Sequence, residues 1–355
     1  MTKIESIRVR PVIVPFVTRT AAGDVTQAPL ALVDLTTSDG VVGCSYIFTY
    51  TNVALKPVCD LIEAFAKLVI GKPVAPLAAE SALVSRMRLL GDTGLITLAI
   101  SAIDMACWDA LAKSVKLPLA RLLGGDITPI KCYLSVGMDG AAGAEKAAET
   151  AVAKGFGALK IKIGFPNFAD DLEAVERARW VLGDKAGLMI DYNQSLDVPE
   201  ALRRCGKLDD MGLMWIEEPT LQDNYSGNAK IAAALRTPIQ IGENWYGTRE
   251  MAKSMAAGAS DLAMLDLMKI GGVTGWLRAA RLAEDAGLPV SSHLFPEMST
   301  HLMCVTPTAH WIEYINLADP ILAEPMQVSK GMIHLSESPG SGVQWDEDAV
   351  ARYAA

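Results

Sequence analysis

The sequence lacks several features that mark other classes of protein. Its six cysteines form no Cys-x-x-Cys pair and no disulfide framework, so we expect free thiols and a cytoplasmic location. Lys and Arg residues form no stripe along the chain, and the formal net charge of −9 argues against binding to nucleic acid. The N-terminal stretch MTKIESIRVR has no apolar core of the kind found in signal peptides.

No long hydrophobic run of the membrane-spanning type is expected either. The most apolar window, residues 95–112, contains Asp104 and Asp109, which predicts a buried helix and no membrane contact. The composition, 51% hydrophobic and 21% charged, is typical of a globular protein. At 355 residues the chain suits a barrel with a smaller partner domain.

Three acidic residues, Asp191, Glu217 and Glu243, stand at two equal intervals of 26 residues. Each ends a short apolar run that is typical of a β-strand. An interval of this size holds one strand, one loop, one helix and a return loop. Because parallel strands of a repeating βα unit end on one face, we expect the three carboxylates to converge. That arrangement is the one a hard divalent cation needs.

The same period continues on both sides of the acidic residues. Eight strand candidates lie between about residues 132 and 315, ending near or containing the residues Val136, Lys162, Asp191, Glu217, Glu243, Asp266, His293 and Glu313. Helical stretches lie between them, for example at 142–155 and 275–287. Eight such units predict an α/β protein with a (β/α)8-type barrel, whose last unit is too short for a full helix.

A different pattern precedes the barrel. The alternation of residues 4–15 predicts a strand, and residues 31–47 predict a hairpin that turns at Ser38-Asp39-Gly40. Helical segments are predicted at 52–70, 77–90 and 93–114. We therefore predict three parts, which are an α+β domain at 1–125, the barrel at 126–320 and a C-terminal segment at 321–355 that returns to the first domain.

Polar residues at the predicted strand ends are the candidates for chemistry. Lys160 and Lys162 lie two apart on one strand, so both side chains share a face. Such a pair is either a solvated strand end or, near a cation, a pair with lowered pKa values of which one acts as a base. Asn193 shares a face with Asp191 and offers neutral polar contacts to a ligand.

Neighbouring strands supply further candidates. Glu217 and Glu218 are adjacent, so we expect them to point to opposite sides and Glu218 to be a structural ion-pair partner. Asp266 and His293 end neighbouring strands, where a carboxylate can fix the tautomer of the histidine. The other histidines are interpreted as satisfied core groups; they are His301, His310 and His334.

Several motifs together carry a family resemblance. They are KIK at 160–162, DYNQSLDVP at 191–199, WIEEPTLQ at 215–222, GENW at 242–245, MKIGGVTGW at 268–276, SSHLF at 291–295 and PTAHWIE at 307–313. The set, with VVGCSY at 41–46 and IDMACWDAL at 103–111, resembles the mandelate racemase subgroup of the enolase superfamily. The resemblance implies a modified TIM barrel, (β/α)7β, under an N-terminal α+β capping domain.

The resemblance also implies a cofactor and a set of contacts to it. Mg²⁺, for which Mn²⁺ can substitute, would be held by Asp191, Glu217 and Glu243. The ion and Lys160 would hold the carboxylate of a small-molecule substrate. Homo-oligomeric assembly from dimers is implied as well.

Roles in proton transfer follow from the same resemblance. Lys162 would be the base on one face of the α-carbon and His293, paired with Asp266, the base on the other. Glu313 would be the acid that hydrogen-bonds the carboxylate as an enolate forms. Further substrate contacts would come from Ser135 and Asn193.

The resemblance implies a mobile lid loop at residues 16–25, and the chain departs from the subgroup there. Its Thr18, Arg19, Ala22 and Asp24 are more polar than a lid built for a phenyl ring. If Arg19 faces solvent, Val25 and Tyr50 would hold an aromatic ring. Arg19 could pair with Asp24 or reach a polar substrate, and the sequence leaves both open. In addition, Val136 follows Ser135 where the namesake of the subgroup has a histidine.

The prediction is therefore a Mg²⁺-dependent racemase of a 2-hydroxy acid, mandelate or a close relative. The first alternative is an acid-sugar dehydratase, a lyase that would use the same residues. A cycloisomerase is disfavoured because His293 with Asp266 supplies a base that Lys269 alone would otherwise provide. A non-catalytic binding barrel is the remote alternative, and no ligand or base of the set is missing.

Overall fold

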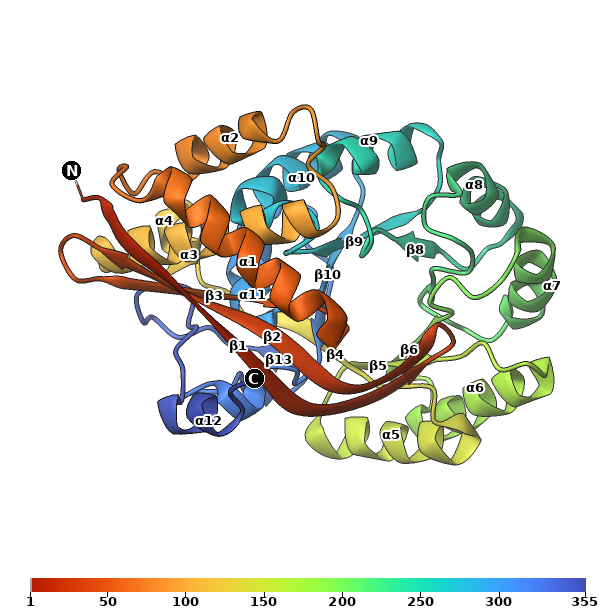
Figure 1. The fold of residues 1–355 in the computed structure, drawn as a ribbon. Coiled ribbons are helices and arrows are strands. Elements are labelled where there is room, and N and C mark those ends of the chain that lie inside the picture. The colour runs from red at the N-terminus through yellow and green to blue at the C-terminus, as the bar shows by residue number, and fades with distance from the viewer. Residues whose placement is uncertain (1) are drawn as a thin grey trace.

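The N-terminal part of the chain forms an α+β cap. The computed structural model describes residues 2–355 and begins with a three-stranded antiparallel sheet, ordered β1-β2-β3. Its strands are β1 (Ile4–Thr20), β2 (Gly23–Thr37) and β3 (Val42–Phe48). The helices α1 (Asn52–Val69), α2 (Pro76–Arg86), α3 (Leu95–Ser114) and α4 (Leu119–Leu122) follow. The expected order of strands first and helices after is confirmed (Figure 1).

Helix α3 is the core helix of the cap. By length and composition alone it could cross a membrane, but 78% of its most apolar window is buried inside the protein. It packs against β3, α1 and, across the domain boundary, α10. Asp104 accepts hydrogen bonds from the Thr274 backbone N–H (3.0 Å) and hydroxyl (2.5 Å) of that barrel helix. This helix therefore joins the cap to the barrel.

The second part is a closed parallel barrel. Its strands are β4 (Ile130–Ser135), β5 (Ala158–Lys162), β6 (Gly187–Asp191), β7 (Ile216–Glu217), β8 (Ile239–Ile241), β9 (Leu262–Asp266), β10 (Val290–His293) and β11 (Ile312–Tyr314). Consecutive strands pair in order from β4 to β10, and β11 pairs with β4 and hydrogen-bonds along β10. The barrel thus closes on itself (Figure 1).

One helix separates each barrel strand from the next. The helices are α5 (Gly140–Lys154), α6 (Phe168–Leu182), α7 (Val198–Leu208), α8 (Tyr225–Ala234), α9 (Thr248–Ala256), α10 (Gly272–Ala286) and α11 (Pro296–Met303). Within residues 2–355, eight barrel strands and seven intervening helices confirm the (β/α)7β architecture. The last helix, α11, is short, and it is the irregular unit that the sequence predicted.

The strand register sets the position of the functional residues. Lys162 pairs with Asp191, Asp191 pairs with Glu217, and His293 pairs with Asp266 in the parallel ladders. Residues paired across neighbouring strands stand at the same height on the barrel. Polar residues from distant parts of the sequence therefore form one ring at the carboxyl ends of the strands.

The predicted lid is a β-hairpin and not a loop. β1 runs on to Thr20, β2 begins at Gly23, and Thr18 pairs with Val25 across the hairpin. The expectation of a loop at 16–25 was wrong because its β-branched residues favour strands, while Gly23 adopts the positive φ (136°) needed near the turn. The hairpin tip reaches the barrel, where Met138 donates a backbone hydrogen bond to Arg19.

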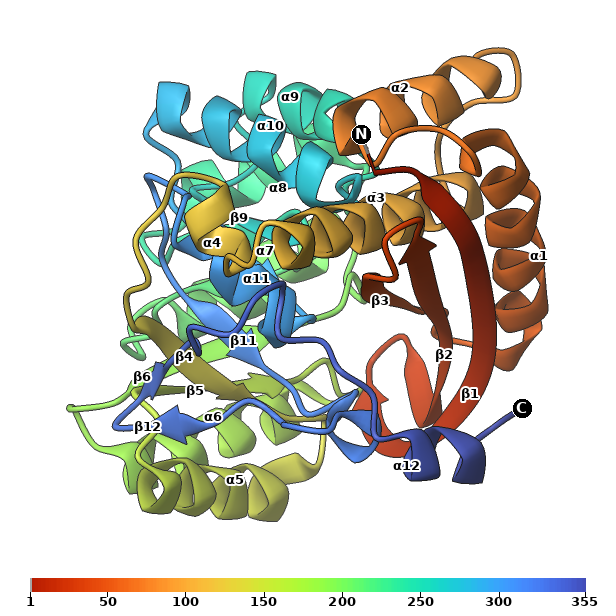
Figure 2. The same ribbon diagram turned by 90° about the vertical axis from the view of Figure 1, so that its left-hand side faces the viewer.

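The C-terminal segment lies against the cap. After the short η1 (Asp319–Ile321), the strands β12 (Val328–Ser329) and β13 (Met332–Ile333) extend the barrel sheet beside β4, and α12 (Glu347–Arg352) follows. Trp345 donates a 2.7 Å hydrogen bond to Asp34, and Arg10 pairs with Glu347 at 2.6 Å. Figure 2 shows α12 beside the outer strand β1 of the cap.

Candidate active site

Three buried carboxylates form a cluster at the ends of β6, β7 and β8. Oxygens of Asp191, Glu217 and Glu243 lie within 4.8 Å of one another. Burial raises the pKa of Glu217 although the Lys160 ammonium opposes that rise, so the cluster is costly without a positive charge. Glu243 Oε2 has no hydrogen-bond partner among the described residues. An all-oxygen donor set with one free buried oxygen fits a hard divalent cation such as Mg²⁺.

The two lysines of β5 contact this cluster. Lys160 forms ion pairs with Glu217 and, at 2.9 Å, with Glu313, and it is fully buried. Lys162 Nζ lies 2.5 Å from Asp191 Oδ2. Burial alone would lower the pKa of Lys162, but the Asp191 carboxylate outweighs burial and raises it. The carboxylates are the closest charges and raise the pKa values of Lys160 and Lys162. The lowering expected for this pair concerned lysines near a cation, and it stays a prediction.

A histidine–carboxylate pair faces Lys162 from the other side of the barrel. His293 Nδ1 lies 2.7 Å from Asp266 Oδ2, and Asp266 Oδ1 accepts the Lys269 backbone N–H at 2.9 Å. His293 Nε2 lies 3.5 Å from Glu243. Burial lowers the pKa of His293, but Glu243 and Asp266 outweigh it and the pKa is raised. The geometry directs Nε2 of this histidine toward the carboxylate cluster.

The other predicted residues lie at different depths. Glu313 is buried, pairs with Lys160 and accepts the Leu294 backbone N–H at 3.1 Å. Burial would raise the pKa of Glu313, but Lys160 brings it down to about 2. Asn193 lines the cavity and donates its side-chain N–H to Asp191 at 2.9 Å. Ser135 is buried, and its hydroxyl has no hydrogen-bond partner within residues 2–355.

A cavity of about 440 Å³ opens between the ring of polar residues and the cap. Lys162, His293 and Glu243 reach it from the barrel, and Val25 and Tyr50, which were predicted to contact the substrate, reach it from the cap. Its size falls within the range of roughly 300–1,000 Å³ that small-molecule sites occupy. Both candidate bases therefore border one ligand-sized space.

The lid hairpin contributes alternate side chains to this cavity. Thr18 and Thr20 line it, whereas Arg19 between them belongs to the opposite face of the strand. The Arg19 side chain is 60% exposed and lies 3.9 Å from Asp139 of the barrel. The sequence left two alternatives open for Arg19, an ion pair with Asp24 or a contact into the cavity. Neither is present among residues 2–355.

Glu218 is a site residue that the sequence interpretation missed. It was expected to form a structural ion pair, but it is fully buried, lines the cavity and accepts a 2.7 Å hydrogen bond from Asn244. The argument from strand alternation fails because β7 ends at Glu217 and Glu218 has a left-handed φ of 39°. Its position directly after a predicted metal ligand was the available signal. Other missed lining residues are Phe48, Gln194, Asn244, Tyr246, Leu294, Ile315 and Leu317.

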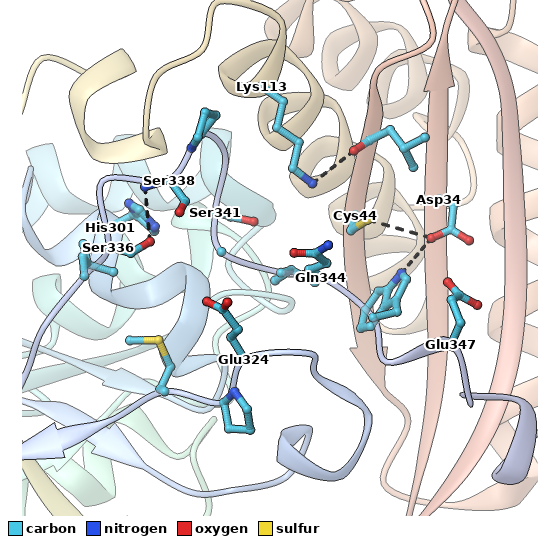
Figure 3. Close-up of a pocket in the computed structure, with 18 of the residues that line it drawn as sticks. Asp34, Cys44, Lys113, His301, Glu324, Ser336, Ser338, Ser341, Gln344 and Glu347 are labelled. Atoms are coloured by element: carbon cyan, nitrogen blue, oxygen red, sulfur yellow. Dashed lines mark hydrogen bonds between the residues drawn. The ribbon is translucent and has the colours of Figure 1, made fainter. Parts of the chain in front are cut away.

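A larger cavity, of about 860 Å³, lies between the cap sheet and the C-terminal segment. Several of its polar groups are hydrogen-bonded: Lys113 donates to the Val42 carbonyl, and Asp34 accepts hydrogen bonds from Cys44 and Trp345 (Figure 3). Burial raises the pKa of the Cys44 thiol to about 12, which leaves it unreactive. Size alone therefore does not select the candidate active site, and the smaller cavity has the candidate catalytic groups.

Comparisons with known proteins agree with this geometry. The model of the mandelate racemase / muconate lactonizing enzyme N-terminal domain matches residues 2–124, and the model of the enolase C-terminal domain-like family matches residues 143–349. The chain belongs to the enolase superfamily. The resemblance seen in its motifs is thereby confirmed.

Individual relatives of this enolase-superfamily protein differ in activity. L-talarate/galactarate dehydratase of Salmonella typhimurium is 34% identical over 263 residues, which are 73% of this chain and 66% of the dehydratase. The 3,6-anhydro-alpha-L-galactonate cycloisomerase of Streptomyces coelicolor is 30% identical over 99% of both chains. An enolase from Bradyrhizobium, solved with magnesium and mandelic acid, is 44% identical over 100% of this chain and 99% of its own, with a TM-score of 0.96.

Proposed function

We propose that the protein is a Mg²⁺-dependent racemase that moves the α-proton of a 2-hydroxy carboxylate between two bases. The observation that carries this proposal is the position of Lys162 and His293 at one cavity. They lie on β5 and β10, separated by β6 to β9 on one side of the barrel and by β4 and β11 on the other. A substrate held between them presents one face of its α-carbon to each base.

Mg²⁺ is the cofactor, held by Asp191, Glu217 and Glu243. Structures of relatives contain magnesium, and the acidic cluster of this chain has the oxygen donors that the ion prefers. When bound, Mg²⁺ supplies positive charge that offsets the negative charge accumulating on the substrate carboxylate. With the charge of Asp191 shared with the ion, Lys162 would be held more readily as the neutral amine that a base requires. We expect Mn²⁺ to substitute.

Each of the remaining side chains has its own role in the reaction. Lys160 donates a hydrogen bond to the substrate carboxylate. Sharing the charge of Lys160 with the substrate raises the pKa of Glu313, which takes up a proton from solvent and then donates it in a hydrogen bond to the same carboxylate. Lys162 removes the α-proton of one enantiomer, and a planar enediolate forms. His293, whose tautomer is fixed by the 2.7 Å contact of its Nδ1 with Asp266, returns a proton to the other face. The reverse sequence converts the second enantiomer.

The remaining lining favours a substrate with a partly apolar side chain. Phe16 and Val25 of the cap face Ile315 and Leu317 of the barrel around the cavity, and burial of an apolar group there is favourable by about 25 cal/mol per Å². The Bradyrhizobium relative was solved with mandelic acid, an aromatic 2-hydroxy acid. These observations support mandelate or a close relative as the substrate.

An acid-sugar dehydratase is the second candidate. It is favoured by the similarity to L-talarate/galactarate dehydratase and by the polar residues Gln194, Glu218 and Lys269 in the same cavity. In that reaction Lys162 would remove the α-proton, and His293 would protonate the departing 3-hydroxyl. The catalytic residues are the same, so the substrate decides between the two reactions.

Proton NMR in D₂O separates these functions. Enzyme with Mg²⁺ is incubated with single enantiomers of 2-hydroxy acids and with acid sugars. We expect loss of the α-proton signal, appearance of the opposite enantiomer on chiral chromatography and no net consumption. New 2-keto-3-deoxy signals instead would establish dehydration. Absence of both changes throughout the panel would contradict both functions. A cytoplasmic location and homo-oligomeric assembly are further proposals, which fractionation and light scattering test.

A further inference from the structure

One wall of the active-site cavity carries polar side chains that the proposed reaction does not use. Gln194, Glu218, Asn244 and Lys269 follow β6, β7, β8 and β9, each one to three residues beyond a residue of the catalytic ring. The loops after β10 and β11 contribute apolar groups instead, Leu294, Ile315 and Leu317. The cavity therefore has a polar sector and an apolar sector.

Glu218 is the most unusual member of the polar sector. It is fully buried, yet its Oε2 has no hydrogen-bond partner in the part of the chain that the structure describes. The other oxygen, Oε1, accepts the Asn244 N–H at 2.7 Å. An unpartnered buried carboxylate oxygen is unfavourable, and the left-handed φ of 39° adds strain. Both features indicate a ligand that supplies the missing donor.

Lys269 provides the opposite polarity beside it. Its Nζ donates a 2.7 Å hydrogen bond to Asn244 Oδ1 and lies 4.7 Å from the centroid of the Tyr50 ring. An ammonium group has three donors, so protons remain for a ligand. Asn244 bonds to both Glu218 and Lys269, and it thereby holds a free acceptor and a free donor at one wall.

A hydroxyl group fits this pair because it donates one hydrogen bond and accepts others. A second carboxylate has no proton to donate to Glu218 Oε2, and an ammonium group has no lone pair to accept from Lys269. We propose that Glu218 and Lys269 form a hydroxyl-binding subsite, so that the substrate is a 2-hydroxy acid with a second hydroxyl on its side chain. This inference rests on the proposed function, since it takes the carboxylate of that substrate to lie at the acidic cluster.

Two families of compounds test the subsite and distinguish where the hydroxyl lies. One compares mandelate with its ring-hydroxylated derivatives, and the other compares 2-hydroxybutyrate with chain-hydroxylated analogues. Affinity is measured by calorimetry with Mg²⁺ present, and turnover by α-proton exchange in D₂O. We expect the hydroxylated member of at least one family to bind about tenfold or more tightly than its parent.

Variants assign the preference to the two residues. In Glu218→Gln and in Lys269→Met, the ratio of the two affinities should fall toward one, because each removes one partner of the hydroxyl. The control is Glu324→Gln, which changes an exposed carboxylate at the other cavity and should keep the wild-type ratio. A ratio that stays at its wild-type value in both variants would overturn the subsite, as would a ratio of one in the wild type.

The readouts also separate this inference from the function on which it rests. Exchange without any preference for hydroxylated compounds would remove the subsite and leave the racemase. A binding preference without exchange of any α-proton would remove the racemase and leave the subsite. Mn²⁺ affinity, followed by electron paramagnetic resonance, tests whether Glu218 serves the metal ion and not the substrate. If Glu218→Gln weakens Mn²⁺ binding and leaves the ligand ratio unchanged, the free oxygen serves the hydration of the ion, and the subsite is overturned.

Discussion

The phenol of Tyr46 in the cap donates a 3.0 Å hydrogen bond to Glu297 in the barrel. Tyr46 also stacks on Phe295, with ring centroids 4.8 Å apart. Both contacts hold the segment directly after His293, where Leu294 (φ 53°) and Phe295 (φ 49°) are consecutive left-handed residues. Each such conformation costs roughly 1–3 kcal/mol, so surrounding contacts must maintain it. The cap therefore helps to position His293, the proposed second base, which belongs to the barrel.

We predict that Tyr46→Phe impairs proton transfer by His293 more than proton transfer by Lys162. The variant keeps the aromatic stack and removes the hydrogen bond to Glu297. Exchange of the α-proton with solvent is measured separately for the two enantiomers. The His293-dependent exchange should slow about tenfold, whereas the Lys162-dependent exchange should change by less than about twofold. Equal losses for both enantiomers would show a general structural role instead.

The two-base mechanism predicts an asymmetric effect of His293→Asn. Asparagine retains polarity but cannot take up a proton, so racemisation should be abolished in both directions. Lys162 should still exchange the α-proton of one enantiomer with solvent. The matched variant Lys162→Gln should show exchange of the other enantiomer only. Retained exchange of both enantiomers in His293→Asn would rule out this histidine as the second base.

Removal of the metal should abolish activity and lower stability together. Without a cation, Asp191, Glu217 and Glu243 repel one another in a buried site. After chelation we expect no exchange, a lower Tm, and recovery of both on addition of Mg²⁺ or Mn²⁺. Glu243→Gln should weaken Mn²⁺ binding in calorimetry and reduce exchange in parallel. Full turnover by a rigorously metal-free sample would contradict the assignment.

The sequence predicted best what depends on strand period and register. The 26-residue spacing of Asp191, Glu217 and Glu243 predicted a barrel and a shared rim because parallel strands leave little freedom at their ends. Prediction from the sequence failed where the backbone departs from a regular helix or strand. Glu218 reaches the cavity through a left-handed φ, and a strand-alternation rule cannot anticipate that conformation.

Contacts between the two domains could not be predicted from the sequence either. Tyr46 and Glu297 are separated by 251 positions, and their hydrogen bond depends on how the cap docks on the barrel. The lid was misjudged for a related reason. Strand propensity at residues 16–25 was present in the sequence, but the expectation of a loop came from the resemblance, and the pairing of Thr18 with Val25 shows a hairpin.

Asp104 should make stability depend on pH. Burial raises the pKa of this carboxyl to about 7 in the fold, from an ordinary value of 3.8. Between these values the folded protein holds a proton that the unfolded chain has lost, so the contribution of Asp104 to stability falls as pH rises from about 4 to 7. Asp104→Asn removes this dependence. Thermal unfolding at pH 5 and pH 7.5 should show the wild-type advantage over the variant shrinking at the higher pH.

The opposite pH dependence would contradict this prediction. Thr274 donates two hydrogen bonds to Asp104, and such donors favour the ionised carboxylate. An advantage of the wild type that grows between pH 5 and pH 7.5 would mean that these bonds outweigh burial. Asp104 would then be charged throughout this range.

Arg19 should contribute little to catalysis despite its position in the lid. Its side chain is 60% exposed, lies outside the cavity and is 3.9 Å from Asp139. Exposed ion pairs contribute about 0–1 kcal/mol, so Arg19→Val should change kcat/KM for mandelate by less than about fivefold. The matched variant Thr18→Val alters the neighbouring residue on the cavity side and should raise kcat/KM for mandelate by adding apolar contact. A fall of a hundredfold or more in Arg19→Val, about 2.7 kcal/mol, would show that Arg19 turns inward to bind substrate, and would favour the acid-sugar reaction.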